Sequence, residues 1–271
     1  MTVLQVIETW FLWLMIYSFV GWVYESILCS ITNKKLINRG FLNGPYCPIY
    51  GCGALLILLI LGRLHNPVLL FFAGAVVTCS LEYFTSYIME KLFHARWWDY
   101  SYMKFNINGR VCLAGAVVFG AGAVALILFL HPAVQGLTDK IPALWLHIIS
   151  GVLFCVFVSD IVITVKGFVG FHEKLDEIRK YVEEQLEAQK EEVSDKLRDL
   201  RDIKTVTFLK NLRETAQSKL NWQQRRMIAA FPALKLKKPD HNELIAKLRK
   251  VLGTKAEKLE KLAKEIKELR G

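Results

Sequence analysis

The sequence predicts an all-α fold: a polytopic membrane bundle of about five transmembrane helices, followed by a long helical tail. The apolar stretches each have close to the ~20 residues that cross a ~30 Å hydrocarbon layer. Charge gathers instead in the second part, since residues 171–271 hold 25 of the 35 Lys and Arg and 18 of the 25 Asp and Glu. These observations predict a transmembrane bundle over residues 1–166 and a cytoplasmic helical tail over residues 167–271.

The predicted spans are residues 9–28, 45–62, 67–89, 111–130 and 143–165. Basic residues in the short loops set their orientation, because cytoplasmic loops are enriched in Lys and Arg. Loops 29–44 and 90–110 hold seven of these residues, whereas loops 61–66 and 131–142 hold two. We therefore expect the N-terminus outside and the tail inside. The opening segment has no basic region and no small-residue cleavage site, so it is expected to remain as a helix.

Three carboxylates lie inside these spans: Glu25, Glu82 and Asp160. An ionisable group at such depth costs at least about 2.5–3.5 kcal/mol on insertion, which makes each a candidate for a functional site. On this threading all three belong to the inner leaflet, within about two helical turns of the cytoplasmic edge. The alternative is that they only pair with basic or backbone groups and fix the bundle. That alternative is strongest for Asp160.

Small and polar residues predict close helix packing around these acids. Gly74, Thr78, Glu82 and Ser86 recur every four residues and therefore form one stripe on a helix. The 111–130 span is rich in Gly and Ala, a composition that lets membrane helices approach closely.

The connection into the second span, residues 40–53, contains Pro45, Pro48 and four glycines. Pro blocks regular backbone hydrogen bonds, and Gly permits dihedral angles closed to other residues. Irregular backbone at membrane depth is tolerated only where it is buried in protein or lines a wet cavity. We therefore predict a re-entrant or broken start to this span. The alternative is an ordinary helix start with Pro in its first turn.

The second cytoplasmic connection, residues 90–110, is rich in aromatic residues, which prefer the headgroup region. Asp99 is an acid set among these aromatics, beside Trp98. Arg110 opens the fourth span at a depth close to that of Glu25, and its planar guanidinium suits a carboxylate or a phosphate. We predict that Arg110 is the counter-charge of the acids and that Glu25, Glu82 and Arg110 share one cavity.

Several ordered motifs resemble one family. They are Gly21-Trp-Val-Tyr-Glu25, Gly40-Phe-Leu-Asn-Gly-Pro-Tyr-Cys-Pro-Ile-Tyr-Gly51, Leu81-Glu-Tyr83, Trp98-Asp-Tyr-Ser101 and Asn108-Gly-Arg-Val-Cys-Leu113. Over about residues 8–165 the chain resembles the bacterial membrane proteins labelled putative ABC-transporter permease, type IV (CmpB-like). The resemblance implies a compact multi-pass bundle in a bacterial inner membrane and a role in transport. The chain has no Gly-x-x-x-x-Gly-Lys-Ser/Thr loop, so ATP hydrolysis would have to come from a partner.

The candidates for substrate or ion binding are Glu25, Glu82, Asp99, Arg110, Asn43, Tyr24, Tyr83, Trp98 and Asp160. For a divalent metal the candidate ligands are Glu25, Glu82 and His94, because carboxylate oxygens suit a hard cation such as magnesium. The sequence identifies no catalytic residue and no cofactor. Its six cysteines include no Cys-x-x-Cys pair, which favours structural thiols.

Apolar residues in the tail recur at helical and nearly heptad spacing. They are Leu175, Ile178, Val182, Leu186, Val193, Leu197 and Leu200, and then Ile245, Leu248, Leu252, Leu259, Leu262, Ile266 and Leu269. Both sets predict long amphipathic helices, which form either coiled coils, within or between protomers, or a solvated hairpin. The tail is therefore a candidate surface for homo-oligomers or a partner protein.

The segment 221–239, between the two sets, combines basic and apolar residues. The predicted membrane-surface residues are Trp222, Arg225, Arg226, Phe231, Lys235, Lys237 and Lys238. Anionic headgroups attract basic residues by about 1 kcal/mol each near the surface. Nucleic acid would satisfy the same charges, but a tethered tail meets the membrane first. We therefore expect anionic lipid of the cytoplasmic face as the partner, and no nucleic acid.

Three classes of function remain open. The first is a transport or lipid-handling component with an acidic polar cavity open to the cytoplasmic leaflet. The second is a membrane-embedded enzyme that acts on a lipid headgroup or a lipid-linked substrate. The third is a membrane scaffold that recruits partners through its helical tail. Glycine-rich packing and the polar stripe favour the first class, whereas motifs gathered near the headgroups favour the second.

Overall fold

The computed structural model describes residues 2–33, 38–192 and 198–253 of the chain. It is 77% helical, as the all-α prediction requires. The chain divides into two compact units. The first comprises Met1–Thr164 with Ala233–Lys235, and the second comprises Val165–Pro232 with Leu236–Gly271.

The first unit is built from long apolar helices. They are α1 (Val3–Asn33), α2 (Pro48–Leu61), α3 (Pro67–Phe93), α4 (Leu113–Ala125), the π-helix η1 (Leu126–Leu130), α5 (His131–Thr138) and α6 (Ala143–Phe168). Four stretches within the described residues are long and apolar enough to cross a membrane: Val3–Ile31, Pro67–Phe93, Leu113–Thr138 and Ala143–Gln185. The protein is therefore a multi-pass membrane protein by length and composition.

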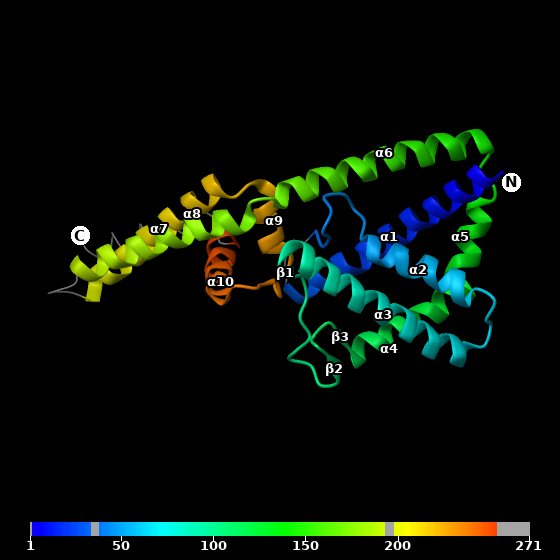
Figure 1. Ribbon diagram of the computed structural model, residues 1–271, viewed down its shortest axis with the longest axis horizontal. Helices are drawn as coiled ribbons and strands as arrows, with labels where there is room; N and C mark the ends of the chain where they lie inside the picture. The colour runs from blue at the N-terminus through cyan, green and yellow to red at the C-terminus, as the bar shows by residue number, and fades with distance from the viewer. Residues whose placement is uncertain (1, 34–37, 193–197, 254–271) are drawn as a thin grey trace. The chain divides into compact units, whose positions relative to one another are not determined.

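The predicted second span, residues 45–62, does not form a full-length spanning helix. Its helix, α2, has 14 residues, which is about 21 Å at ~1.5 Å per residue. Figure 1 shows that α2 and α4 run opposite to α1 and α3, so the chain still passes between the two ends of the unit at this point. Part of this passage is not helical, as expected for a span with a broken start.

The non-helical part, residues 40–47, lies beside the middle of α1. The Cys47 amide donates to the Ser18 carbonyl at 2.9 Å, and Tyr46 is buried. Pro48 then opens α2 in its first turn. The irregular backbone agrees with the predicted broken start, and the alternative, Pro in the first turn, describes the start of α2 itself. Such backbone needs partners inside the protein, and Asp160 supplies several of them.

Small residues bring the helices of this unit into close contact. A Cβ on Gly51 would lie 2.4 Å from the Leu14 carbonyl oxygen, so α2 meets α1 backbone to backbone. A Cβ on Gly74 would lie 2.2 Å from the Cβ of Ala123, which seats α3 against α4. Gly thus permits the close approach that the composition predicted.

A compact connection joins α3 to α4. It contains the short strands β1 (Ala95–Arg96), β2 (Asn106–Ile107) and β3 (Val111–Cys112). Strands β2 and β3 pair antiparallel, with Asn106 opposite Cys112 and Ile107 opposite Val111. The turn between them holds Asn108 and Gly109 at positive φ, a conformation that Asn and Gly adopt most readily.

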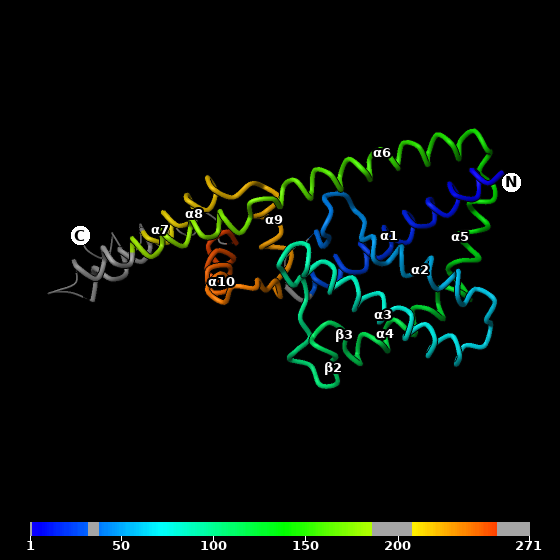
Figure 2. Tube along the Cα trace, in the orientation of Figure 1, coloured from blue at the N-terminus to red at the C-terminus, as the bar shows by residue number. Residues whose placement is uncertain are grey.

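The second unit is a cluster of amphipathic helices. They are α7 (Phe171–Glu192), α8 (Arg198–Lys219), α9 (Trp222–Ala230) and α10 (Pro239–Gly253). The short strand β4 (Lys235–Leu236) joins the last residue of the first unit's segment 233–235 to the first residue of the segment that follows in the second unit. Figure 2 traces α7 and α8 as neighbouring antiparallel helices, and α10 packs against α7, α8 and α9. The side chains that are at most 2% exposed include Leu175, Ile178, Leu212, Leu220, Met227, Ile228, Ile245 and Leu248.

The coiled coil stays a prediction. The side chains of Leu186, Val193, Leu197 and Leu200 lie outside the described residues, as do Leu259, Leu262, Ile266 and Leu269. Within the described part, Leu175, Ile178 and Val182 are buried at the predicted spacing on α7.

Candidate functional site

The first unit contains a partly open cavity of about 380 Å³ between α1, α2, α3 and α4–η1. Its walls are mainly apolar. They are lined by Tyr17, Val20, Gly21, Tyr24, Glu25, Arg39, Ile49, Tyr50, Gly53, Ala54, Ile57, Thr78, Leu81, Glu82, Trp98, Tyr100, Val118, Phe119, Gly122, Ala123, Leu126 and Leu130. This volume lies within the ~300–1,000 Å³ typical of small-molecule sites.

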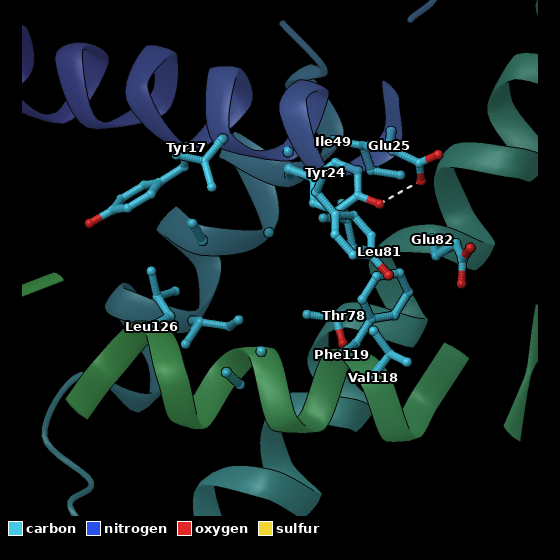
Figure 3. Close-up of a pocket in the computed structure, with 18 of the residues that line it drawn as sticks. Tyr17, Tyr24, Glu25, Ile49, Thr78, Leu81, Glu82, Val118, Phe119 and Leu126 are labelled. Atoms are coloured by element: carbon cyan, nitrogen blue, oxygen red, sulfur yellow. Dashed lines mark hydrogen bonds between the residues drawn. The ribbon is translucent and has the colours of Figure 1, made fainter. Parts of the chain in front are cut away.

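The cavity is acidic at one end and mainly apolar along the rest of its length. Figure 3 shows Glu25 and Glu82 together at one end, with Leu126 toward the other. The acids come from α1 and α3, two helices that are far apart in sequence. The sequence-predicted pair of carboxylates therefore lines one cavity.

Glu25 has two strong partners at this end. The Tyr50 hydroxyl donates to Glu25 Oε1 at 2.6 Å, the bond drawn as a dashed line in Figure 3. Arg39 Nε lies 3.6 Å from Glu25 Oε2. The guanidinium offsets the charge of this carboxylate, so the pair presents little net charge to the cavity.

Glu82 is buried and only partly satisfied. It is 6% exposed, and the Tyr100 hydroxyl donates to its Oε1 at 3.2 Å. Its Oε2 has no hydrogen-bond partner among the described residues. A buried carboxylate oxygen without a donor is costly, so the hydrogen-bonding capacity of Glu82 is only partly used.

Close packing fixes both acids in place. A Cβ on Gly21 would lie 2.3 Å from the Tyr50 ring, so glycine at this position lets Tyr50 reach Glu25 one turn later on α1. On α3, Gly74 packs against α4, and Thr78 bonds back to the Gly74 carbonyl at 2.7 Å. The predicted stripe of small and polar residues thus leads along the α4-facing side of α3 to Glu82.

Arg110 does not hold the cavity acids, contrary to the prediction. Its Nη2 lies 2.6 Å from Glu90 Oε2, and its Nη1 donates to Ser86 at 3.1 Å. Its guanidinium also stacks at 5.6 Å from the Tyr83 ring and 5.5 Å from the Tyr87 ring. Its partners Ser86 and Glu90 lie one and two turns after Glu82 on α3, so Glu90 is the carboxylate that the Arg110 guanidinium reaches. The counter-charge at the cavity is Arg39.

Asp160 anchors the irregular segment before α2 and does not line the cavity. Its Oδ1 accepts from the amide and the side chain of Asn43, at 3.1 and 2.8 Å. Its Oδ2 accepts from the Gly44 amide at 2.8 Å and the Tyr46 hydroxyl at 2.6 Å. Thr164 adds a further donor at 3.1 Å. Asp160 therefore fixes the bundle through backbone and side-chain donors, as in the alternative stated for it, and Asn43 is one of those donors.

The aromatic connection supplies some cavity residues and excludes others. Trp98 lines the cavity and donates to the Arg110 carbonyl at 3.0 Å. Asp99 lies outside the cavity lining and bonds Ser101 and Lys235. Burial raises the pKa of Asp99, but hydrogen bonds from Lys235 and Ser101 outweigh it and bring the pKa down to about 2. Tyr83, also outside the lining, accepts a bond from Asn108 at 2.9 Å.

Of the candidate metal ligands, Glu25 and Glu82 line the cavity, but His94 does not join them. Among the described residues, no group of three or more His, Cys, Asp or Glu is placed to hold an ion. His94 ends α3 in the left-handed conformation, with φ 51°, and does not line the cavity. The turn at the end of α3 thus separates His94 from the two glutamates.

A family model described as putative ABC-transporter type IV matches residues 12–165. The match covers more than half of the chain and the whole of the cavity lining. The chain belongs to the putative ABC-transporter type IV family. No curated protein and no solved structure matches the chain.

Within this family member, the sequence-based reasoning missed three polar residues of the cavity. In the sequence, Arg39 stands out only as one basic residue of the loop 29–44, and Tyr50 and Tyr100 only as members of the motifs 40–51 and 98–101. The signal for Tyr50 was present, because Gly21 and Glu25 lie one turn apart and face a Pro- and Gly-rich partner segment. Tyr100 carried no comparable signal, since its contact depends on how the connection folds back. Burial raises its pKa, with Glu82 adding to the effect.

The tail segment 221–239 is folded differently from a surface patch. Met227, Ile228 and Phe231 are buried, and Arg249 of α10 donates to the Ile228 and Phe231 carbonyls at 3.0 Å each. Phe231 is therefore unsuited to contact lipid in this fold. Trp222, in contrast, is 60% exposed and is accessible for such a contact.

Basic residues of the segment also have partners within the protein. Arg225 donates to the Leu220 carbonyl at 2.9 Å, and Arg226 stacks on Trp222 at 5.7 Å. Lys238 pairs with Asp176 at 2.9 Å, and Lys235 pairs with Asp99. Any lipid contact would thus rest on exposed basic side chains, Lys237 included, and on the exposed Trp222, not on the buried apolar side chains.

Proposed function

We propose that this chain is the membrane component of a transporter that takes an amphiphilic substrate into the cavity between α1, α2, α3 and α4–η1. The observation that carries the proposal is the division of the cavity. Both carboxylates and the Tyr50 and Tyr100 hydroxyls gather at one end, and mainly apolar side chains line the remainder, where the Tyr17 hydroxyl is already bonded to His131. A ligand with a polar head and an apolar body matches that division, because each part keeps its preferred surroundings.

Membership of the transporter family supports the same reading. The loop charges favour a cytoplasmic position for the acidic end, in a bacterial inner membrane. The chain has no phosphate-binding loop of the Gly-x-x-x-x-Gly-Lys-Ser/Thr type. A separate ATPase would then supply the energy for uphill movement, whereas the cavity itself would select the substrate.

Two glycines offer a matched test. A Cβ on Gly122 has open space around it and projects from the cavity lining, and a Cβ on Gly151 of α6 has open space but lies outside that lining. Gly122→Leu should fill the cavity without a backbone clash, and Gly151→Leu should add the same side chain elsewhere.

The measurement uses full-length protein in liposomes that carry a fluorescent short-chain amphiphile in the inner leaflet. We expect the protein to speed exposure of the amphiphile to an outside quencher. Gly122→Leu should slow this movement several-fold, while Gly151→Leu leaves it at the rate of the original protein. Equal rates in the two variants would contradict a role for the cavity.

An enzyme acting on a lipid headgroup gives a different result in the same liposomes. Mass spectrometry of the recovered amphiphile would then show a changed headgroup, and Glu82→Gln would abolish that change. Movement of chemically unchanged amphiphile supports transport.

A further inference from the structure

We propose that the cavity selects amphiphiles with an ammonium headgroup, and that Glu82 is the residue that recognises this group. The inference rests on the proposed function and adds the chemical class of the ligand. It covers both an aminophospholipid of the membrane and a free alkylamine, which share an ammonium group attached to an apolar body.

The first argument is the unsatisfied acceptor of Glu82. The side chain is more than nine-tenths buried and lines the cavity, and its Oε2 has no partner among the described residues. A carboxylate oxygen accepts hydrogen bonds when ionised. A ligand that donates to it, and brings positive charge, would relieve the cost of leaving it bare.

The second argument is the charge of the lining. It contains two acids, Glu25 and Glu82, and one basic residue, Arg39. Arg39 lies 3.6 Å from Glu25, so the remaining acid is Glu82. The hydroxyls of Tyr50 and Tyr100 already donate to these carboxylates. The polar end is therefore rich in acceptors, and an anionic headgroup would meet the Glu82 carboxylate, which no ion pair with a basic residue of the lining offsets.

The third argument is the aromatic surrounding of the polar end. Tyr24, Tyr50, Trp98 and Tyr100 line the cavity together with Glu82. Aromatic faces attract ammonium groups within about 6 Å of the ring centre. The rings thus favour the same sign of charge as the carboxylate.

The apolar remainder accommodates the body of the ligand. Ile57, Leu81, Val118, Phe119 and Leu126 line it, and these side chains offer no hydrogen bonds. An alkyl chain or an aromatic group fits such walls, whereas a second polar group would find few partners there, because the Tyr17 and Thr78 hydroxyls are already bonded to His131 and the Gly74 carbonyl. A small hydrophilic amine would lack the apolar contacts.

The test compares three probes that share a ten-carbon chain: decylammonium, decyl sulfate and decanol. Each is added below its micellar concentration to the full-length protein in a neutral maltoside, and the thermal unfolding midpoint reports binding. We expect decylammonium to raise the midpoint most, decanol less and decyl sulfate least. Equal shifts for decylammonium and decanol would overturn the role of charge.

The matched variants are Glu82→Gln and Asp139→Asn. Asp139 is an exposed acid after α5 and lies outside the cavity lining. Glu82→Gln should weaken decylammonium binding about tenfold to a hundredfold, the usual loss with a charged hydrogen bond, and should leave decanol binding nearly unchanged. Asp139→Asn should change neither. Decylammonium binding that is equal in Glu82→Gln and the original protein would overturn the assignment. The comparison of decanol with decylammonium remains decisive if the Glu82 variant is unstable.

Two further arms separate the sources of the ammonium group. The protein is placed in nanodiscs of phosphatidylcholine, or in nanodiscs that also contain phosphatidylethanolamine. Competition by phosphatidylethanolamine against decylammonium would identify the membrane lipid as a source, whereas undiminished binding would favour a free amine. If no probe of any charge binds, the proposed function fails; if decanol binds as well as decylammonium, only this inference fails.

Discussion

Glu82 and Asp160 are buried acids on two apolar helices, yet their hydrogen-bond partners differ. Five donors from Asn43, Gly44, Tyr46 and Thr164 surround the Asp160 carboxylate. Glu82 receives one bond from Tyr100 and leaves one oxygen without a partner. A satisfied carboxylate stabilises the fold, whereas an unsatisfied one beside a cavity would gain free energy from a ligand that donates to it.

Asp160→Ala should destabilise the first unit. The substitution leaves the amides of Asn43 and Gly44 and the Tyr46 hydroxyl without an acceptor at membrane depth. We expect a loss of about 2–4 kcal/mol, as for other broken buried networks. The unfolding midpoint in detergent measures it, and Ser150→Ala on the same helix is the control, because the Ser150 hydroxyl bonds back to the Leu146 and His147 carbonyls of its own helix. Similar midpoints for the two variants would contradict the anchoring role.

Arg110 gives a second prediction at this scale. Its bond to Glu90 predicts that Arg110→Ala and Glu90→Gln couple in a double-mutant cycle by about 0.5–3 kcal/mol. Arg110→Ala and Glu82→Gln should add within about 0.5 kcal/mol, because Arg110 makes no bond to Glu82. The cycles are read from unfolding free energies. Strong coupling with Glu82 and none with Glu90 would restore the arrangement that the sequence predicted.

The sequence led to Glu25 and Glu82 because apolar surroundings make an acid conspicuous. It misassigned the counter-charge, since Arg110 and Arg39 both lie near the predicted edge of the membrane. Only the fold of two irregular segments decides which guanidinium reaches which carboxylate. Depth along a helix can be read from residue numbers, whereas the direction of a loop side chain cannot.

At the scale of elements, α2 is the clearest departure from the predicted bundle. Hydropathy treats residues 45–62 as one span, but Pro48 starts the helix late and residues 40–47 complete the passage without helical bonds. Gly51 and Gly21 are needed because α2, α1 and the Tyr50 ring meet without intervening side chains. The apolar walls of the cavity follow from this packing, which the Gly and Pro content indicated only in outline.

In the tail, amphipathic spacing predicted helices but not their mutual packing. Apolar residues of segment 221–239 pack inside the tail, since Met227 and Ile228 are fully buried. A basic, apolar stretch has the same sequence pattern whether its apolar face meets lipid or other helices. The expected lipid contact therefore stays a proposal for the exposed basic residues.

The contact between α7 and α10 predicts a pH dependence of the tail. Hydrogen bonds from Lys238 and His241 hold the pKa of Asp176 at about 2, below its usual 3.8. A depressed folded-state pKa stabilises the fold above the unfolded value, and the stabilisation is lost as pH falls from about 4 to about 2. Asp176→Asn should remove this part of the acid sensitivity.

Hydrogen exchange of α10 in the full-length protein measures the effect. Protection should fall between pH 4 and pH 2 in the original protein more steeply than in Asp176→Asn. Glu184→Gln, at an exposed position of α7, the helix that carries Asp176, should behave like the original protein. An unchanged pH profile in Asp176→Asn would show that Asp176 does not link α7 to α10.

At the scale of the whole molecule, the orientation in the membrane is a prediction from loop charge. Lys104 belongs to a loop that is expected inside, and Lys140 to one expected outside. In intact cells, an impermeant thiol reagent should label Lys140→Cys and spare Lys104→Cys, each made without the natural cysteines. The reverse pattern would invert the orientation and place the acidic end of the cavity outside.

The occupancy of the cavity by an amphiphile is the central claim, and photo-crosslinking tests it most directly. The probe is an alkylammonium with a diazirine in its chain, and mass spectrometry locates the labelled residues. The account predicts labels on the lining residues Leu81, Val118, Phe119 and Leu126, which excess decylammonium should remove. Labels confined to the outward-facing Phe72, Val76 and Phe154, and unaffected by decylammonium, would contradict it.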